Sequence, residues 1–271
     1  MKIGIIISLE PEILEKNFAK AKELEVESCQ LSCWKPELLT KENAELLKAL
    51  SLKYGIEISA VIGGWSGPKA WNFESGPMTL GIVPAAYRHI RTNELLKAID
   101  FASELSVSDI NTHIGFIPEN SSDTLYKEVV ACVKYICTYA KTKNINFCME
   151  TGQETPIALL RLIEDTQADN IGVNLDPANL LMYGKANPID ALDILGKYIK
   201  GVHGKDGEYP TSSKSLGNET PMGEGRVNFP LFIAKLKELG YDGSITIERE
   251  ISGEKRETDI ITARDILKSL I

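Results

Sequence analysis

Four residues with metal-ligating side chains stand at similar intervals along the second half of the chain: Glu150, Asp176, His203 and Glu248. Each follows a short apolar run and precedes a polar or glycine-containing loop, in the segments FCMETGQE, VNLDPANL, KGVHGKDG and SITIERE. Three carboxylates and one imidazole form a mostly hard ligand set, which favours Mn²⁺ or Mg²⁺, with Co²⁺ or Zn²⁺ as alternatives. Without a cation the converging negative charges would raise at least one carboxyl pKa. We therefore predict a site for one divalent metal ion, with Mn²⁺ as the first choice.

Eight short apolar runs, typical of buried parallel strands, alternate with eight helical patterns. The runs cover residues 3–7, 28–32, 56–62, 109–112, 145–149, 171–175, 198–202 and 244–247. The helical patterns cover residues 11–24, 40–54, 92–105, 123–140, two segments that open at 155 and 187, 229–239 and 260–271. This alternation predicts an α/β fold, a (β/α)8 TIM barrel in which residues 1–271 form a single domain. The four residues would then end successive strands and meet at the carboxyl-terminal mouth.

Further residues are predicted to contact a substrate because they end or follow strands at the same mouth. They are His113, Asn179, Glu154, Lys205, Asp206, Trp65 and Arg226. For Glu154 and Asp206, an equal alternative is a supporting or loop carboxylate. A phosphorylated substrate would need cationic donors such as Arg88, Arg91, Lys205 or Arg226, but basic loop residues are more often solvated.

Two long loops, residues 63–91 and 204–227, interrupt the regular alternation. Loops of this length are uncommon inside a compact domain unless they have a function. The first loop is rich in glycine, proline and tryptophan, and it follows a strand, so it should lie at the mouth. It is a candidate lid, with an insertion that merely packs over the barrel as the alternative. Its candidate contact residues are Trp65, Trp71, Tyr87, Arg88 and Arg91.

The composition is that of an ordinary soluble protein, with 43% hydrophobic and 25% charged residues among 271. A net charge of −8 argues against a nucleic-acid or anionic-membrane partner, since both favour basic surfaces. The five cysteines are odd in number and match no zinc-site spacing, so we expect free thiols in a reducing compartment, the cytoplasm. The first apolar run is too short for a signal peptide or a membrane span.

Taken in order, the motifs resemble those of the sugar phosphate isomerase/epimerase family within the xylose-isomerase-like TIM barrel superfamily. The resemblance rests on His113 at the end of the fourth strand, METG, NLDPAN, HGKDG, the GEG loop and GYDGSITIERE. It implies that the four residues bind one divalent metal and that Glu150 and Glu248 also act as acid and base. Family members often carry a histidine three residues after the aspartate, where this chain has Asn179.

The resemblance implies a metal-dependent isomerase or epimerase for a sugar or cyclitol. Glu150 and Glu248 would be catalytic, and the reaction would proceed by proton abstraction next to a carbonyl through a metal-held enediolate. Alternatives on the same site are an inosose-dehydratase-type or a keto- or C-glycoside-cleaving lyase, and a non-catalytic sugar-binding barrel. An AP endonuclease is disfavoured by three histidines and the acidic charge. We expect a small-molecule partner, no nucleic acid, no membrane, and exposed helices that leave room for a homo-oligomer.

Overall fold

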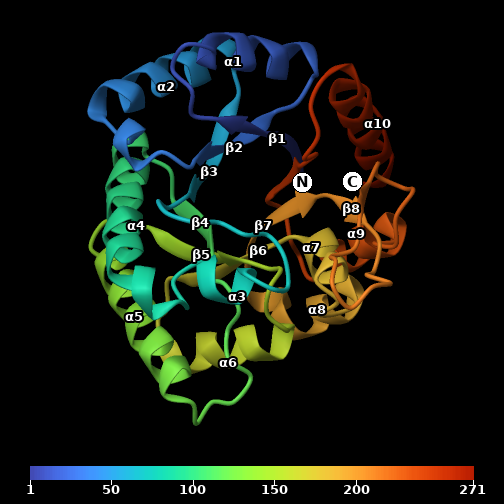
Figure 1. Cartoon of the computed structure of the whole chain (residues 1–271). Helices are drawn as coiled ribbons and strands as arrows, with labels where there is room; N and C mark the ends of the chain where they lie inside the picture. The colour runs from blue at the N-terminus through green and yellow to red at the C-terminus, as the bar shows by residue number, and fades with distance from the viewer.

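A closed barrel of eight parallel strands forms the centre of the computed structural model, which describes residues 1–271 (Figure 1). Around the barrel the strands follow the order β1-β10-β7-β6-β5-β4-β3-β2. Their bounds are β1 Lys2–Ser8, β2 Ser28–Cys33, β3 Glu57–Gly63, β4 Asp109–His113, β5 Asn146–Glu150, β6 Ile171–Leu175, β7 Ile199–Gly204 and β10 Ser244–Ile247. The predicted (β/α)8 TIM barrel is confirmed.

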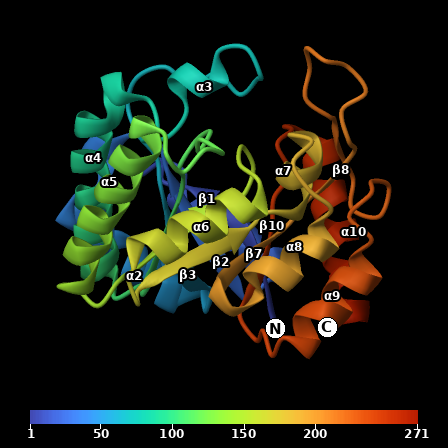
Figure 2. The same ribbon diagram turned by 90° about the horizontal axis from the view of Figure 1, so that it is seen from below.

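The main helices surround the strands (Figure 1), and shorter ones lie in the loops. Their bounds are α1 Leu14–Glu23, α2 Lys41–Tyr54, α3 Gly76–Thr79, α4 Ala85–Leu105, α5 Thr124–Lys141, α6 Pro156–Thr166, α7 Pro177–Met182, α8 Pro188–Leu195, α9 Phe229–Glu238 and α10 Glu254–Leu270. None of them combines the length and the apolar composition that a membrane crossing requires. The two termini lie near one another (Figures 1 and 2).

Local sequence determines where several of these helices begin. The side chains of Thr40, Asp123 and Thr155 accept hydrogen bonds from backbone N–H groups in the first turns of α2, α5 and α6. Such caps satisfy donors that have no partner inside the helix. Gly55 ends α2 in the left-handed conformation that glycine adopts at low cost. One continuous apolar core then joins the helices to the strands.

The register of the strands brings the predicted site residues to one edge of the barrel. His113 on β4 lies opposite Glu150 on β5, and Glu150 lies opposite Asn174 on β6. On the other side, His203 on β7 pairs with Thr246 on β10, two residues before Glu248. All five strands are parallel, so these side chains share the carboxyl-terminal end.

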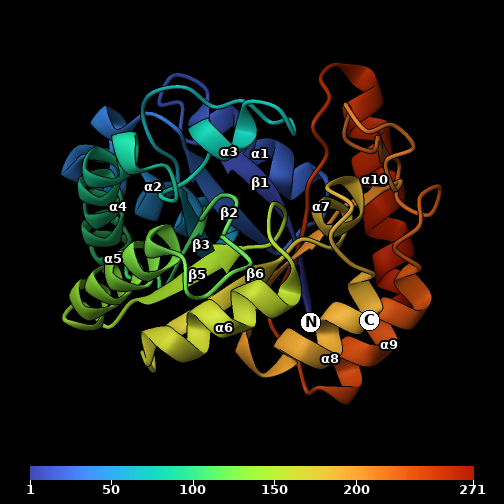
Figure 3. The same cartoon turned by 60° about the horizontal axis from the view of Figure 1, so that its bottom comes forward.

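Both long loops rise from that same end (Figures 2 and 3). The loop after β3 carries the short helix α3, and the loop after β7 contains a small antiparallel sheet of β8 (Asp206–Gly207) and β9 (Glu219–Thr220). Trp71 from the first loop and Leu216 from the second line the same cavity. The two loops together therefore enclose the mouth of the barrel.

The boundary of the first loop differs from the predicted one. Helix α4 begins at Ala85, seven residues before the predicted start at Thr92, so the loop ends at Pro84. Polar and aromatic residues in this first part of α4 hide the helical pattern because some of them face the protein. Arg91 is fully buried and donates to the backbone carbonyls of Ser66, Pro68, Thr79 and Gly81. Likewise, the predicted closing helix begins at Glu254, six residues early.

Arg91 is expected to make a large contribution to stability. Arg91→Met should lower the free energy of unfolding by about 3 kcal/mol, because four loop carbonyls lose a charged donor while the apolar stem is kept. Urea unfolding followed by circular dichroism measures the change. Arg226→Met is the matched control, since Arg226 is exposed and should change stability by less than about 0.5 kcal/mol. Equal stability of the two variants would contradict the structural role of Arg91.

Candidate metal centre

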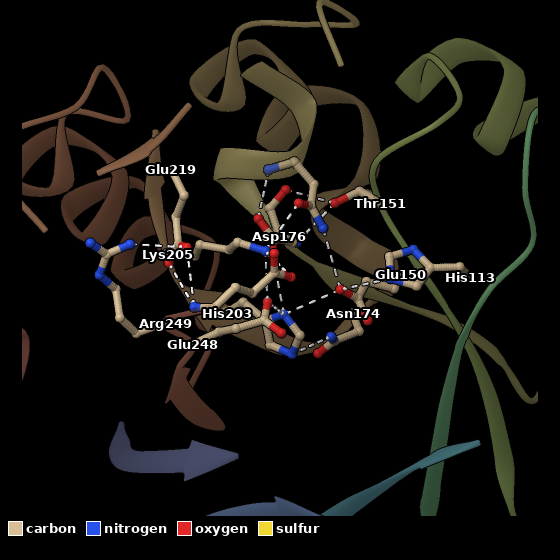
Figure 4. A network of polar contacts seen from close by, with 12 residues as sticks. His113, Glu150, Thr151, Asn174, Asp176, His203, Lys205, Glu219, Glu248 and Arg249 are labelled. Atoms are coloured by element: carbon tan, nitrogen blue, oxygen red, sulfur yellow. Dashed lines mark hydrogen bonds and ion pairs between the residues drawn. The ribbon is translucent and has the colours of Figure 1, made fainter. Parts of the chain in front are cut away.

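Four side chains converge at the carboxyl-terminal mouth: Glu150, Asp176, His203 and Glu248 (Figure 4). One ligand atom from each lies within 4.8 Å of the others. The Nδ1 atom of His203 is 3.3 Å from Glu150 Oε1, 3.3 Å from Asp176 Oδ2 and 3.2 Å from Glu248 Oε2. The sequence prediction that these residues meet at one point therefore matches the geometry.

These spacings suit a single divalent cation. Ligands about 2.1 Å from an octahedral ion are about 3.0 Å from their neighbours, close to the distances around His203 Nδ1. The charges also fit. When His203 is neutral, as a metal ligand must be, three carboxylates face one ammonium, that of Lys205, which leaves a negative excess of two. A divalent cation would neutralise this excess, whereas a dry cluster would be penalised by mutual repulsion.

Two polar side chains orient His203. Its Nε2 atom is 2.9 Å from Gln30 Oε1 on β2 and 2.9 Å from the Asn174 amide on β6. Gln30 in turn donates to Asn174 Oδ1 at 3.0 Å. A histidine that binds metal through Nδ1 carries its proton on Nε2, and Gln30 Oε1 accepts the hydrogen bond from that N–H, while Asn174 holds Gln30 in place. Sequence reasoning missed both residues, although each is a polar residue inside an apolar strand.

Asp176 uses its two carboxylate oxygens for different purposes. Oδ1 accepts from the backbone N–H of Asn179 and so caps α7, while Oδ2 faces His203. Thr151 holds the backbone of Asp176 through two hydrogen bonds, one to its N–H and one to its carbonyl. Oδ2 is therefore the oxygen turned toward the other ligands, and Asp176 would bind a metal through it.

Lys205 is a buried cation beside the ligands. Its ammonium donates to Glu250 Oε1 at 2.8 Å, Glu248 Oε2 at 3.2 Å and Asn179 Oδ1 at 3.3 Å. The amide nitrogen of Asn179 is 3.4 Å from Glu150 Oε1, so Asn179 links the two glutamates. Asn179 lines the cavity above the cluster, whereas Lys205 is buried outside the cavity wall, and both hold the ligand carboxylates.

The pKa values of the four cluster residues depend on two opposing effects: burial disfavours the charged form, and neighbouring opposite charges favour it. Burial works against ionisation of Glu248, but Lys205 and His203 outweigh it and hold the pKa of Glu248 well below its usual range. Burial similarly opposes ionisation of Glu150, and His113 with His203 lowers its pKa. Burial dominates at Asp176 and raises its pKa. For His203, burial favours the neutral ring, yet Glu150 and Glu248 raise its pKa well above the usual value.

A cavity of about 490 Å³ opens above the cluster and includes Glu150 and Glu248 in its wall. The wall combines apolar residues, among them the indoles of Trp34 and Trp71, with the polar side chains of His113, Gln153, Asn179 and Tyr183. His113 Nε2 is 3.3 Å from Glu150 Oε1, so the predicted contact residue His113 lies beside a predicted catalytic group. A sugar-sized molecule with both apolar and hydroxyl-bearing faces suits this cavity.

Trp65 does not lie in the cavity wall. It is fully buried, with its ring centre 5.1 Å from that of Trp34 and 6.5 Å from that of Trp71. It supports these two indoles from behind, and Arg91 covers it at 5.3 Å from the ring centre. The cavity wall thus contains Trp34 and Trp71 in place of Trp65, for which the sequence predicts a substrate contact.

Asp206 and Arg226 also lie outside the wall. The Asp206 carboxylate accepts from the backbone N–H groups of Gly207, Gly223, Gly225 and Val227, so it organises the GEG loop. At Gly225, a Cβ atom would come within 2.2 Å of Asp206 Oδ1, which explains the glycine. The side chain of Arg226 is exposed, and its backbone N–H donates to Gly207.

Glu154 is buried outside the cavity wall, and no side chain forms a hydrogen bond with its carboxylate. Burial raises its pKa from 4.5 to about 8. Between these pH values the folded protein holds a proton that the unfolded chain releases, so this residue makes the protein less stable as pH rises.

Replacing Glu154 should therefore remove part of the pH dependence of stability. In EDTA, Glu154→Gln is expected to lose less unfolding free energy than wild type between pH 5 and pH 8, because the amide does not ionise. Urea unfolding at both pH values measures the difference. Glu164→Gln, on the exposed face of α6, should follow the wild type. A Glu154→Gln profile parallel to wild type would contradict the elevated pKa.

Fold and site together define a (β/α)8 barrel with a four-residue candidate metal cluster at its carboxyl-terminal mouth. A family model described as "Xylose isomerase-like TIM barrel" matches residues 18–270, and the chain belongs to this family. The resemblance drawn from the motifs is thereby confirmed at the level of the superfamily.

Individual proteins agree with this assignment. The crystal structure of a xylose isomerase domain protein from Planctomyces limnophilus is 33% identical and has a TM-score of 0.93, covering 99% of this chain and 96% of that one. A D-tagatose 3-epimerase-like protein shares the fold, with 24% identity, a TM-score of 0.77 and coverage of 100% and 97%. The protein MJ1311 of Methanocaldococcus jannaschii is 27% identical over 285 residues, which span 100% of this chain and 89% of that protein.

Proposed function

We propose that the protein is a divalent-metal-dependent isomerase or epimerase that removes a proton next to the carbonyl of a sugar or cyclitol. One observation carries the proposal. Glu150 and Glu248 belong to the same ligand cluster and both line one cavity, from strands that are not neighbours in the barrel. Two carboxylates on different sides of one bound molecule are the arrangement that removal and return of a proton requires.

When bound, the divalent ion would supply Lewis-acid polarisation of the substrate carbonyl. Glu150 Oε1 faces His113 and His203, and Glu248 Oε2 faces His203 and Lys205. The second oxygens, Glu150 Oε2 and Glu248 Oε1, are left to accept or donate the substrate proton. Return of the proton to the opposite face gives an epimer, whereas return to the adjacent carbon gives the aldose or ketose isomer.

The cavity favours an uncharged substrate over a phosphorylated one. Lys69 is the cation in its wall, and its ammonium already donates to the carbonyl of Trp65. Arg88 and Arg91 donate to carbonyls of the first loop, and Arg226 lies outside the wall. The carboxylates of Glu150, Glu248 and Glu250 add negative charge that repels a phosphate group.

Hydrogen exchange tests the proposed function directly. The purified protein, supplied with Mn²⁺ in D₂O, is incubated with D-fructose, D-tagatose and scyllo-inosose, and NMR follows deuterium entry next to the carbonyl. We expect about one divalent ion per chain and exchange into at least one of these compounds. An unsaturated product would indicate a dehydratase. Absence of a bound ion, of stabilisation by Mn²⁺ and of exchange would refute the proposal.

A further inference from the structure

The cavity wall contains a buried amide that has no aligned hydrogen bond to any protein group. Gln153, in the loop between β5 and α6, lines the cavity and is 1% exposed. Neither its Oε1 nor its Nε2 atom makes an aligned hydrogen bond within the protein, and its polar neighbour is the Tyr183 hydroxyl. Burial of an amide without partners costs free energy, so such groups in a native fold call for an explanation.

A second unsatisfied group stands beside it. Tyr183, at the end of α7, lines the same cavity next to Gln153, and its hydroxyl makes no aligned hydrogen bond. Its ring is held in place by Phe73 and Phe116, with ring centres 6.2 Å and 6.0 Å away. Burial raises the pKa of Tyr183 to about 12, so the hydroxyl is protonated at neutral pH and can donate.

A second buried glutamine provides a contrast within the same chain. Gln30 is also 1% exposed, but both of its polar atoms are engaged, one with Asn174 and one with His203. The role of Gln30 is thus explained by the protein alone. Gln153 lacks such partners, and its position in the wall directs attention to the molecule that enters the cavity.

We propose that Gln153 and the Tyr183 hydroxyl are specificity-determining residues that bind a pair of neighbouring hydroxyl groups on the substrate, away from the carbons that react. An amide offers one acceptor and two donors, which matches two adjacent hydroxyls better than a phosphate or a carboxylate. The inference rests on the proposed function and narrows its substrate class to uncharged polyols with a carbonyl. It adds that the substrate must carry a vicinal diol.

The physical consequence is discrimination by hydroxyl content. A site built to hydrogen-bond a substrate hydroxyl rejects an analogue that lacks it, because the polar groups of the site stay unpaired. Removing the amide from the protein should abolish this preference. The binding affinities of wild type and a Gln153 variant should therefore differ most for the fully hydroxylated compound and least for the analogue that lacks that hydroxyl.

The test uses Gln153→Leu and Tyr183→Phe, with Gln30→Leu as the matched control for stability. In Mn²⁺-loaded protein, Gln153→Leu and Tyr183→Phe should melt within about 2 °C of wild type or above it, since no aligned hydrogen bond within the protein is lost. Gln30→Leu should melt lower by several degrees. A fall in Tm for Gln153→Leu as large as that for Gln30→Leu would overturn the inference by showing a structural role.

Binding provides the second readout. Titration calorimetry measures the affinities of D-fructose, D-tagatose, scyllo-inosose and monodeoxy forms of whichever binds best. Each of the two variants should bind that compound about tenfold more weakly and lose the preference over one deoxy form. Equal affinities for wild type and variants would overturn the inference alone. No binding of any compound to wild type would instead overturn the proposed function on which it rests.

Discussion

Glu150→Gln and Glu248→Gln are each expected to lower the rate of solvent deuterium exchange by about 10²- to 10⁴-fold, the range attributed to a positioned acid or base. Each variant removes a proton acceptor but keeps an oxygen that can still bind a metal. In an epimerase the two variants should also differ in which epimer still exchanges its proton, because each carboxylate serves one face of the substrate. Exchange measured separately from each of the two epimers would show this asymmetry.

Glu250→Gln is the matched control for this experiment. Glu250 lines the same cavity and pairs with Lys205, but its side chain is 58% exposed and it does not belong to the ligand cluster. Glu250→Gln should lower the rate of deuterium exchange by less than about tenfold. Metal content must be measured for all three variants, since the glutamates are also predicted ligands. Normal exchange in metal-loaded Glu150→Gln and Glu248→Gln would remove both residues from the mechanism.

Removal of the metal is the second large expected effect. Chelation should abolish exchange, and addition of Mn²⁺ at about 100 times its Kd should stabilise the fold by about 2.7 kcal/mol. Gln30→Leu should weaken metal binding by about 10- to 100-fold, because the amide that fixes the orientation of His203 is lost. Gln153→Leu, the same substitution at a buried glutamine of the cavity wall, should leave metal affinity unchanged.

The pH dependence of metal binding gives an independent check of His203 as a metal ligand. In the metal-free protein, Glu150 and Glu248 raise the pKa of His203 well above its usual value despite burial. A cation must displace this proton from Nδ1, so affinity should fall as pH falls through the neutral range. Calorimetry in buffers of different ionisation enthalpy would detect the released proton. Metal affinity independent of pH between 6 and 8 would contradict His203 as a ligand.

The barrel and the cluster could be predicted from sequence because both depend on strand ends. Apolar runs mark the strands, and in a parallel barrel every carboxyl end faces one mouth, so Glu150 and His203 must share it. In the loops beyond the strand ends, no regular sequence pattern indicates which way a side chain points. That is why Trp65 and Asp206, predicted as substrate contacts, instead support the wall and the GEG loop.

The residues that sequence reasoning missed have a common physical cause. Gln30 lies on β2 and contacts His203 on β7, across the barrel interior and 173 positions away in the chain. A contact of this kind depends on barrel closure and on register, which a single sequence does not display. The early start of α4 has a related origin, since Arg91 makes an inward helical position look polar.

The tryptophans at the cavity allow binding to be followed by intrinsic fluorescence. The chain has three tryptophans, and Trp34, Trp65 and Trp71 stand within 6.5 Å of one another at the cavity. Trp71 also lies 4.9 Å from His113, next to Glu150. All indole fluorescence therefore originates beside this cavity and none from elsewhere in the barrel. Entry of a sugar or loading of a paramagnetic ion such as Mn²⁺ can be followed by emission alone, without a label.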